Sequence, residues 1–366
     1  MADLFRMKWG VFAAVFCALA ALQFPSALAQ SAPKYSNEFL SIGVGARGLS
    51  MFRTQTAVVG DVTAGYWNPA GLTRIKDRYQ ASIMHAEYFG GIAKYDYLAG
   101  SMRLDSASAL SVSLIRFGVD DIPDTRYLYD ANGAINYSNV RFFSAADYAF
   151  IGSYGRKVSW LPGLSVGGSV KIVHRIAGSF AYSWGFGLDA SAQWTHRNWQ
   201  LGLMLRDVTG TYNAWTNNSS LVQSIYNQTG NEIPKNSLEV TTPKSILGVA
   251  RYFRIGKDVG VLPALDLLLT FDGRRNVLVR SALVSLDPSL GVELDYRRLA
   301  FLRLGIGNTQ RVKSFSGGYN TAAQWGGGMG IRLKHATVDY ALTQNGTGAG
   351  TVLSHTFSLL INVDEW

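Results

Sequence analysis

The chain has 366 residues, a formal net charge of +9 and a single cysteine. It is rich in glycine and aromatic residues (39 Gly, 18 Tyr, 18 Phe, 9 Trp), and only 16% of its residues are charged. Length alone allows two soluble domains or one large all-β domain, and this composition favours the second. Because Cys17 lies in a segment expected to be removed, the mature protein is expected to have no disulfide and no cysteine-based metal site.

The amino terminus has the pattern of a secretory signal peptide over residues 1–29. Arg6 and Lys8 precede an apolar run, and Ala27-Leu28-Ala29 supplies a small-x-small cleavage site, so the mature chain is expected to begin at Gln30. That apolar run is too short for a membrane-spanning helix, and no later stretch has the roughly 18 consecutive apolar residues that such a helix needs. An exported chain of this kind can still span a membrane as a closed β-barrel.

The segment 30–78 is predicted to form an amino-terminal plug in the lumen of such a barrel. Its part 39–72 is apolar and rich in glycine, and its only charged residues are Arg47, Arg53 and Asp61. This composition suits an interior. Taken alone, the stretch is equally compatible with a buried segment of a soluble α+β domain.

The segment 79–366 is predicted to be a transmembrane antiparallel β-barrel. It contains about 14 segments, each roughly 9 to 14 residues long, in which apolar and polar residues alternate as in tilted membrane strands. In residues 290–297, one face is apolar and the other charged: Leu290, Val292, Leu294 and Tyr296 against Glu293, Asp295 and Arg297. In residues 184–194 the apolar face begins and ends with Trp, as expected for aromatic girdles at two membrane interfaces.

The connections between these segments alternate in length. Short ones are predicted at 105–108, 159–163, 196–198, 297–299 and 334–335, and long polar ones at 119–141, 207–241, 273–286 and 308–323. Further short links near Gly90, Gly178 and Gly346 make this sorting imperfect. Short turns on one rim and long loops on the other are typical of a transmembrane barrel and not of a soluble sandwich.

A glycine run in a late strand has two interpretations. Gly326, Gly328 and Gly330 share one face, which removes side chains from that face. Either the run forms a kink in the wall that opens a lateral path for an apolar ligand, or it makes space for the plug or a bend. Arginines elsewhere are predicted to face a polar lumen: Arg206, Arg303 and Arg332.

The opening stretch resembles the PorV/PorQ family of outer-membrane proteins, distant relatives of the FadL fatty-acid transporters. The matching residues are 39–48, 60–61 and 66–72, and Asn68, Pro69 and Ala70 fall on the Asn-Pro-Ala motif of these families. The resemblance implies a 14-stranded barrel with its amino-terminal segment folded into the lumen.

The same resemblance implies a location and two functions. The location is the outer membrane, in contact with its lipid, of a Gram-negative, Bacteroidota-like cell. One function is a component of type IX protein secretion, with a translocon and secreted cargo as partners. The alternative is a FadL-like channel for a hydrophobic small molecule.

The candidate gating residues lie in the plug: Arg47, Asp61, Trp67, Asn68, Pro69 and Ala70. Asn68 before proline is expected to close an Asx-type turn, with Pro69 beginning a helical turn. Trp67 is expected to anchor this bend by packing into the barrel wall. The alternative is that the motif only ends the plug segment and binds nothing.

Other functions are disfavoured. The five histidines lack metal-ligand spacing, so no metal or cofactor is predicted. Ser354 and Ser358 lie near His355, but neighbours in a strand face opposite sides, so no enzyme is predicted. Export and membrane patterning argue against nucleic acid as the partner of the net positive charge, and favour contacts of arginines with anionic headgroups.

Overall fold

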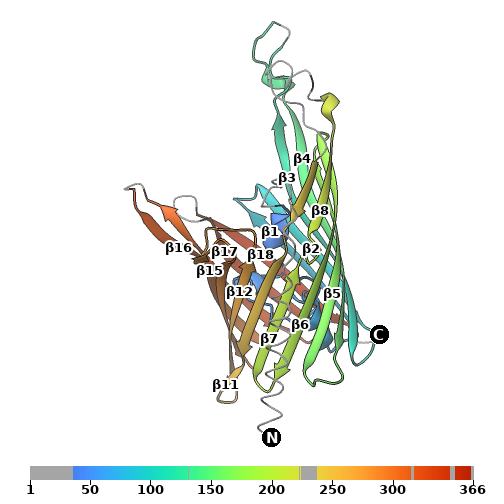
Figure 1. The fold of residues 1–366 in the computed structure, drawn as a ribbon, viewed down its shortest axis with the longest axis vertical. Coiled ribbons are helices and arrows are strands. Elements are labelled where there is room, and N and C mark those ends of the chain that lie inside the picture. Colours follow the sequence, from blue (N-terminus) through green and yellow to red (C-terminus); the bar gives the residue numbers. More distant parts are fainter. Residues whose placement is uncertain are drawn as a thin grey trace. The chain divides into compact units, whose positions relative to one another are not determined.

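The described residues form one closed antiparallel sheet (Figure 1). The computed structural model describes residues 36–130, 132–221, 223, 237–314, 317–346 and 351–363. The sheet closes because β1 (Tyr79–Tyr88) pairs with both β2 (Ala93–Arg103) and β18 (Val352–Val363). The predicted signal peptide, 1–29, lies outside the described residues, and the predicted plug is described from Ser36.

Fourteen strands make up the barrel wall. The remaining strands are β3 (Ser108–Asp124), β4 (Arg141–Lys157), β5 (Leu164–Ala177), β6 (Ala181–His196), β7 (Trp199–Arg206), β8 (Thr211–Asn217), β9 (Ser237–Thr241), β10 (Lys244–Arg251), β11 (Phe253–Ile255), β12 (Val259–Thr270), β13 (Val279–Arg280), β14 (Ser285–Tyr296), β15 (Ala300–Lys313), β16 (Tyr319–Arg332) and β17 (Ala336–Asn345). β7 and β8 lie end to end along β6 as one wall strand, and β9, β10 and β11 form the next. β13 only pairs with β14 in the connection that follows β12. The predicted number of strands is therefore confirmed.

The two rims of the barrel differ in their connections. We call the rim with the short connections the turn side: 104–107, 158–163, 197–198, 256–258, 297–299 and 333–335. The opposite rim is the loop side, where β3 and β4 extend far beyond their neighbours (Figure 1). Tyr79 pairs with Val363, so the first and last strands meet at the turn side.

Three predicted loops are shorter than expected, because strands continue into them. β3 runs to Asp124, β8 and β9 occupy both ends of 207–241, and β15 and β16 leave only 314–318 of the predicted 308–323. Polar residues are frequent in the extensions of β3 and β15, which weakens the alternation that marks a strand in the sequence, whereas β8 and β9 keep apolar outward residues such as Tyr212 and Leu238. Two further short connections are found on the loop side, at 89–92 and 178–180.

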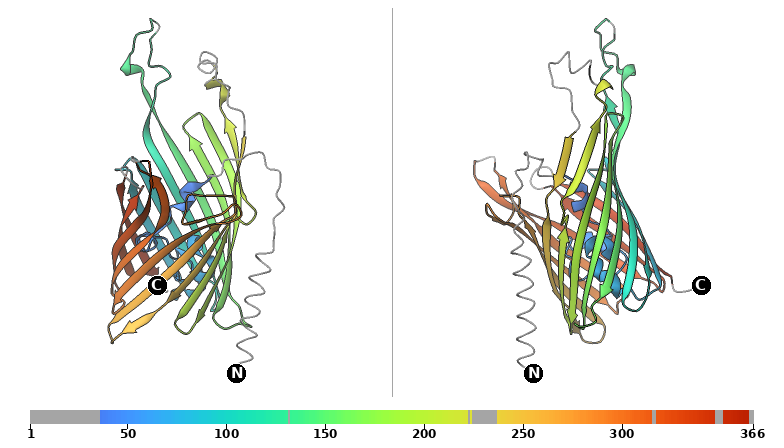
Figure 2. Two further views of the ribbon diagram at one scale, coloured as in Figure 1. Left: turned by 60° about the vertical axis from the view of Figure 1, so that its left-hand side comes forward. Right: turned by 45° about the vertical axis from the view of Figure 1, so that its right-hand side comes forward.

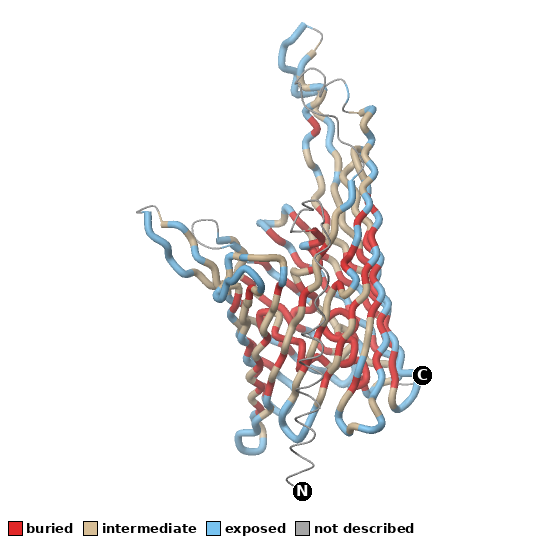
Figure 3. The backbone as a smooth tube through the Cα atoms, in the orientation of Figure 1, coloured by how far each residue is buried: buried red, intermediate tan, exposed pale blue. Residues whose placement is uncertain are grey.

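Side chains alternate between the lumen and the outer surface as predicted. Leu290 and Trp184 face outward and are each 53% exposed, whereas Glu293 and Asp295 face the lumen and are 7% and 6% exposed. Figure 3 shows buried residues alternating with intermediate and exposed ones along the strands of the barrel body, and mostly exposed residues in the turns and loops at the rims. An apolar outer surface around a polar lumen is the pattern of a membrane barrel.

The segment before β1 fills the lumen and makes short helical turns there: η1 (Glu38–Ser41), α2 (Ala46–Ser50), α3 (Ala64–Trp67) and η2 (Pro69–Arg74). Figure 2 shows it, in blue, enclosed by the wall. Two further turns lie in loop-side connections: η3 (Tyr137–Asn139) and η4 (Ser219–Leu221). In the described part of the chain, no helix is long and apolar enough to cross a membrane.

Glycines in the wall make room for the plug. A Cβ atom at Gly167 in β5 would lie 2.5 Å from the amide nitrogen of Ala70, and one at Gly326 in β16 would lie 2.6 Å from the carbonyl oxygen of Leu49. Both distances are shorter than real Cβ contacts, so the backbones approach too closely for any side chain. The same holds at other lumen-facing positions: Gly155, Gly202, Gly248, Gly291 and Gly305. Part of the high glycine content thus serves plug packing.

The hairpin of β15 and β16 leaves the wall on the loop side. β14 and β15 pair only from Tyr296↔Ala300 to Leu290↔Ile306, and β16 and β17 pair only from Arg332↔Thr337 to Gly326↔Thr343. Beyond these points β15 and β16 remain paired with each other, after a register shift between Gly307 and Gln310. In Figure 1 this hairpin, at the upper left, bends away from the barrel.

Candidate functional site

The plug crosses the lumen from the loop side to the turn side. At its start, Ser36 donates a hydrogen bond from Oγ to Oε2 of Glu239 (3.0 Å), which lies in β9. At its end, Ile75 leads into β1 at the turn side. The plug therefore separates two spaces, which we call the loop-side pocket and the turn-side cavity.

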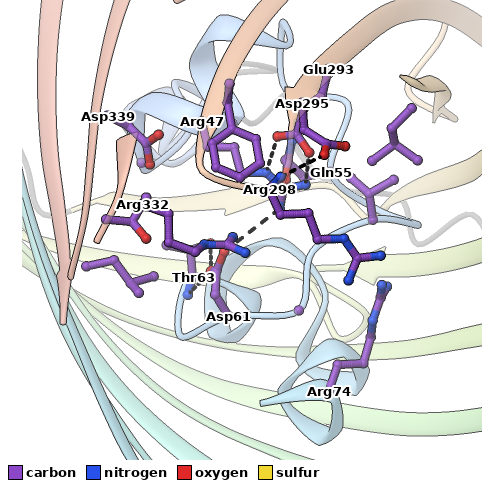
Figure 4. A pocket seen from close by; sticks show the side chains of 18 of the residues that line it. Arg47, Gln55, Asp61, Thr63, Arg74, Glu293, Asp295, Arg298, Arg332 and Asp339 are labelled. Atoms are coloured by element: carbon purple, nitrogen blue, oxygen red, sulfur yellow. Dashed lines mark hydrogen bonds and ion pairs between the residues drawn. The ribbon is translucent and has the colours of Figure 1, made fainter. Parts of the chain in front are cut away.

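The turn-side cavity has a volume of about 670 Å³ and is lined mainly by charged and polar groups (Figure 4). Its charged side chains come from the plug, from wall strands and from turn-side connections: Arg47, Asp61, Arg74, Lys76, Asp77, Arg197, Glu293, Asp295, Arg298, Arg303, Arg332 and Asp339. The prediction that Arg303 and Arg332 face a polar lumen is confirmed.

An ion-pair network joins the plug to the wall in this cavity. The Nε atom of Arg47 lies 2.8 Å from Oε2 of Glu293, which also accepts from Nε of Arg303 at 2.7 Å. Arg303 continues to Oδ1 of Asp339 at 2.6 Å. Burial opposes the charge of Arg47, but the attraction and hydrogen bonds of Glu293 outweigh this effect and raise the Arg47 pKa above its usual range. Arg47 also lies 3.9 Å from Asp61.

The Asn-Pro-Ala motif lies at the turn between α3 and η2. Oδ1 of Asn68 accepts a hydrogen bond from the amide of Ala70 (3.2 Å), and Pro69 begins η2. The Asn68 amide nitrogen donates to the carbonyl oxygens of Thr56 (2.8 Å) and Ala192 (3.1 Å), so the motif joins two plug segments and strand β6. The motif is buried, and none of its three residues lines the turn-side cavity.

The main contact of Trp67 differs from the prediction that it packs into the wall. Its ring lies against Gly43 and Gly48 of the plug, where added Cβ atoms would lie 2.7 and 2.9 Å from ring carbons. Its Nε1 donates to the carbonyl oxygen of Val44 at 3.0 Å. Gly43 has a φ of 104°, which favours glycine. Trp67 thus forms a core for the plug itself, because glycines at these positions leave a flat surface for the ring.

Two further wall residues hold plug backbone groups. Oδ2 of Asp266 accepts from the amides of Gln55 (3.1 Å) and Thr56 (3.0 Å). Arg206 donates to the carbonyl oxygens of Leu40 and Tyr66, each at 3.2 Å, which confirms its predicted lumenal position. These bonds satisfy backbone groups that a short irregular segment leaves unpaired.

The loop-side pocket has a volume of about 380 Å³ and a largely apolar lining. Its apolar side chains come from the plug, from β1 and β3, and from the connection after β1: Phe39, Ile42, Leu49, Phe52, Tyr88, Phe89 and Phe117. Side-chain amides form another part of the lining: Asn308, Gln324, Gln344 and Asn345. Its charged residues are Glu38 and Arg53, and burial lowers the pKa of Arg53.

The loop-side pocket borders the place where β16 parts from β17. Gln324 lies just beyond the last paired residue of β16, and Thr343, Gln344 and Asn345 lie at and beyond the last paired residue of β17. In the described residues, no strand pairing joins 319–325 to β17. The pocket is therefore adjacent to a gap in the wall.

The predicted kink glycines lie beside the plug and below this gap. Gly326 lies against the backbone of Leu49, and a Cβ added to Gly328 would lie 2.7 Å from Cβ of Ser50. An added Cβ on Gly330 would meet the carboxylate of Asp339. All three glycines remain paired with β17, so the separation of the strands begins where the glycine run ends.

Sequence reasoning missed the loop-side pocket and the partners of Arg47. The roles of Glu293 and Asp266 could have been inferred from the sequence, because an acidic residue on the lumenal face of a membrane strand needs a partner there. No sequence pattern indicates that Phe117 and Gln324 line one pocket, because they come together only when the barrel closes.

Comparison with known proteins shows similarity in fold. No family model and no curated protein matches the chain. Among solved structures, the CymD monoaromatic hydrocarbon channel has a TM-score of 0.57 at 12% identity, over 88% of this chain and 98% of that one. The Pseudomonas putida toluene transporter TodX has a TM-score of 0.56 at 14% identity, over 88% and 98%. A Pseudomonas aeruginosa FadL homologue has a TM-score of 0.53 at 11% identity, over 88% and 98%.

The first of these proteins is a channel and the second a transporter. At such low identities the likeness concerns the architecture and not the ligand. Membership of the PorV/PorQ family stays a prediction from the opening motif. What the chain shares with these proteins is the closed 14-strand antiparallel barrel of FadL-like outer-membrane proteins.

Proposed function

We propose that this protein is an outer-membrane channel for a hydrophobic small molecule. The observation that carries the proposal is the loop-side pocket, an apolar space between plug and wall that borders the gap between β16 and β17. A mostly apolar pocket with a few polar groups is the usual form of a small-molecule site. The names of the structural neighbours, a monoaromatic hydrocarbon channel and a toluene transporter, support the same class of ligand.

The membrane location is supported by the outer surface of the barrel. Apolar side chains cover the outward face of consecutive wall strands, as Leu302, Met329, Val338 and Phe357 do on β15 to β18. Closure of the sheet pairs the backbone groups that lipid cannot satisfy.

The route is proposed to run sideways through the gap and not along the barrel axis. The plug fills the lumen along the barrel axis. The turn-side cavity beneath it is charged, so an apolar molecule that moved from the loop-side pocket into this cavity would lose its apolar contacts. The gap leads instead from an apolar pocket toward the hydrocarbon of the bilayer. This route is the lateral path predicted for Gly326, Gly328 and Gly330, displaced to the residues that precede them in β16, toward the loop side.

Uptake by cells tests the proposal. Cells of a host without hydrocarbon channels would express the protein, and the initial uptake of labelled toluene and of labelled oleate would be measured. We expect uptake of at least one probe above that of cells with an empty vector. Phe117→Ala, in the pocket, should lower it several-fold, whereas Phe142→Ala, on an exposed part of β4, should not. Uptake equal to the empty vector for both probes would contradict the proposal.

The role in type IX secretion, with a translocon and secreted cargo as partners, stays a prediction from the sequence resemblance. Periplasmic trapping of cargo after deletion of the gene would support it, and normal secretion would remove it.

A further inference from the structure

Three arginines project into the turn-side cavity without an acidic partner. Figure 4 shows Arg74, Arg298 and Arg332 extending into this space. The ion pairs of the cavity engage Arg47 and Arg303. Within the described ranges, no ion pair engages any of the other three. We propose that these three arginines form a binding site for a small, water-soluble phosphate compound.

Each guanidinium is held in place by contacts that leave most of its donors free. Arg74 is packed against Gly60, where an added Cβ would lie 3.1 Å from its Nε, and it donates from Nη1 to the carbonyl oxygen of Ala57 at 3.2 Å. A guanidinium carries five N–H donors, so one such bond leaves the group able to bind an anion. Arg74 is therefore positioned in advance.

The other two arginines are positioned by aromatic rings. The guanidinium carbon of Arg332 lies 5.0 Å from the centre of the Phe301 ring, and that of Arg298 lies 5.5 Å from the centre of the Tyr252 ring. Such cation–π contacts hold the plane of the group and do not consume its N–H donors. Tyr252 is fixed in turn by its hydroxyl, which donates to Asp295 at 3.0 Å.

The charge balance of the cavity favours an anion. Among the described residues, seven basic and five acidic side chains line it, an excess of two positive charges. Burial, followed by the positive charge of Arg47, lowers the pKa of Arg74 to about 10, so this arginine remains charged at neutral pH but lies in a positive environment. A concave site enclosed by protein of low dielectric constant concentrates such a field and attracts counter-ions.

The geometry favours phosphate over a single carboxylate. The three guanidinium groups come from the plug (η2), from the β14–β15 turn and from the end of β16, so they approach the cavity from different directions. A tetrahedral anion presents several oxygens and can accept from more than one guanidinium, and guanidinium groups bind phosphate oxygens in pairs. The cavity volume of about 670 Å³ also accommodates a group larger than phosphate alone.

Calorimetric titration of the full protein in detergent tests the site. The probes are inorganic phosphate and pyrophosphate, with sodium chloride at matched ionic strength as the blank. We expect saturable binding of at least one probe. The triple variant Arg74→Gln, Arg298→Gln, Arg332→Gln should weaken it at least tenfold, and Arg254→Gln should leave it unchanged, because Arg254 lies in β11 at the same rim but does not line the cavity.

Folding is checked by the shift in gel migration that a folded barrel shows on heating. If the triple variant does not fold, the three single variants replace it, and each should weaken binding. Heats equal to the chloride blank for both probes would overturn the proposal. So would binding by the folded triple variant, or by all three single variants, at the strength of the unmodified protein.

Discussion

The two spaces on either side of the plug differ in the side chains that line them. The loop-side pocket is mainly aromatic and aliphatic, with amides beside the wall gap. The turn-side cavity is larger and contains an ion-pair network that joins the plug to the wall. The difference indicates that the plug is a partition: apolar molecules have a favourable space on one side only, and the opening nearest to that space is in the wall.

Loss of the ion-pair network should have the largest effect on this partition. Glu293→Gln leaves Arg47 and Arg303 without their shared carboxylate, and breaking such a buried network costs about 3 kcal/mol. The plug should loosen, so the conductance of single barrels in planar bilayers should rise and the temperature of the heat-induced gel shift should fall.

The matched control for this variant is Glu87→Gln. Glu87 is exposed on the outward face of β1, where its loss leaves the plug contacts intact. Unchanged conductance and heat stability in Glu293→Gln would show that the plug is not held by this network.

A smaller effect is expected from filling the space between plug and wall. Gly326→Ala places a methyl group against the carbonyl of Leu49, and overpacking of this kind costs about 1–3 kcal/mol. The heat-induced gel shift should occur at a lower temperature, with a rise in conductance smaller than that of Glu293→Gln. Gly100→Ala is the control, because an added Cβ there meets no atom within 4 Å. Equal behaviour of the two variants would mean that the plug does not depend on this close approach.

The smallest effect should come from Asp266, which holds the plug by hydrogen bonds to its backbone. Asp266→Asn keeps one oxygen that can accept from the amides of Gln55 and Thr56 but loses the charge, a change of about 1 kcal/mol. Heat stability should fall slightly. The conductance of single barrels should stay at the level of the unmodified protein, because the plug still separates the two spaces. A rise in conductance in this variant as large as that expected for Glu293→Gln would show that Asp266, and not Glu293, is the main anchor of the plug.

Much of the wall could be predicted from the sequence, because each membrane strand has a period of two that neighbouring residues reveal. Segments such as 184–194 and 290–296 show their lumenal and outward faces directly. The bend at Asn68 and Pro69 was also predictable, because these residue types favour that turn locally.

The neighbours of the site residues could not be predicted from the sequence. The glycine run at 326–330 could be found, but its neighbours could not, since α2 meets β16 only after the barrel closes. Trp67 was assigned to the wall because nothing local indicates that Gly43 and Gly48 return to it. The phosphate-site arginines come from three distant parts of the chain, so no short motif joins them.

The measurement that tests the lateral route most directly is uptake through a barrel whose gap can be locked. The only cysteine of the sequence is Cys17, in the predicted signal peptide, so introduced cysteines can be linked selectively. Gln324→Cys and Asn345→Cys would occupy the next inward-facing opposed positions if the pairing of β16 and β17 continued into the gap. A control pair, Met329→Cys and Tyr340→Cys, lies where these strands are already paired.

With toluene or oleate as the probe, whichever the unmodified protein takes up, a cross-linker that joins the two thiols through reducible disulfide bonds should abolish uptake in the gap pair. Reductive release of the linker should restore it, and the control pair should transport in both states. Uptake that continues unchanged in the fully cross-linked gap pair would contradict the lateral route.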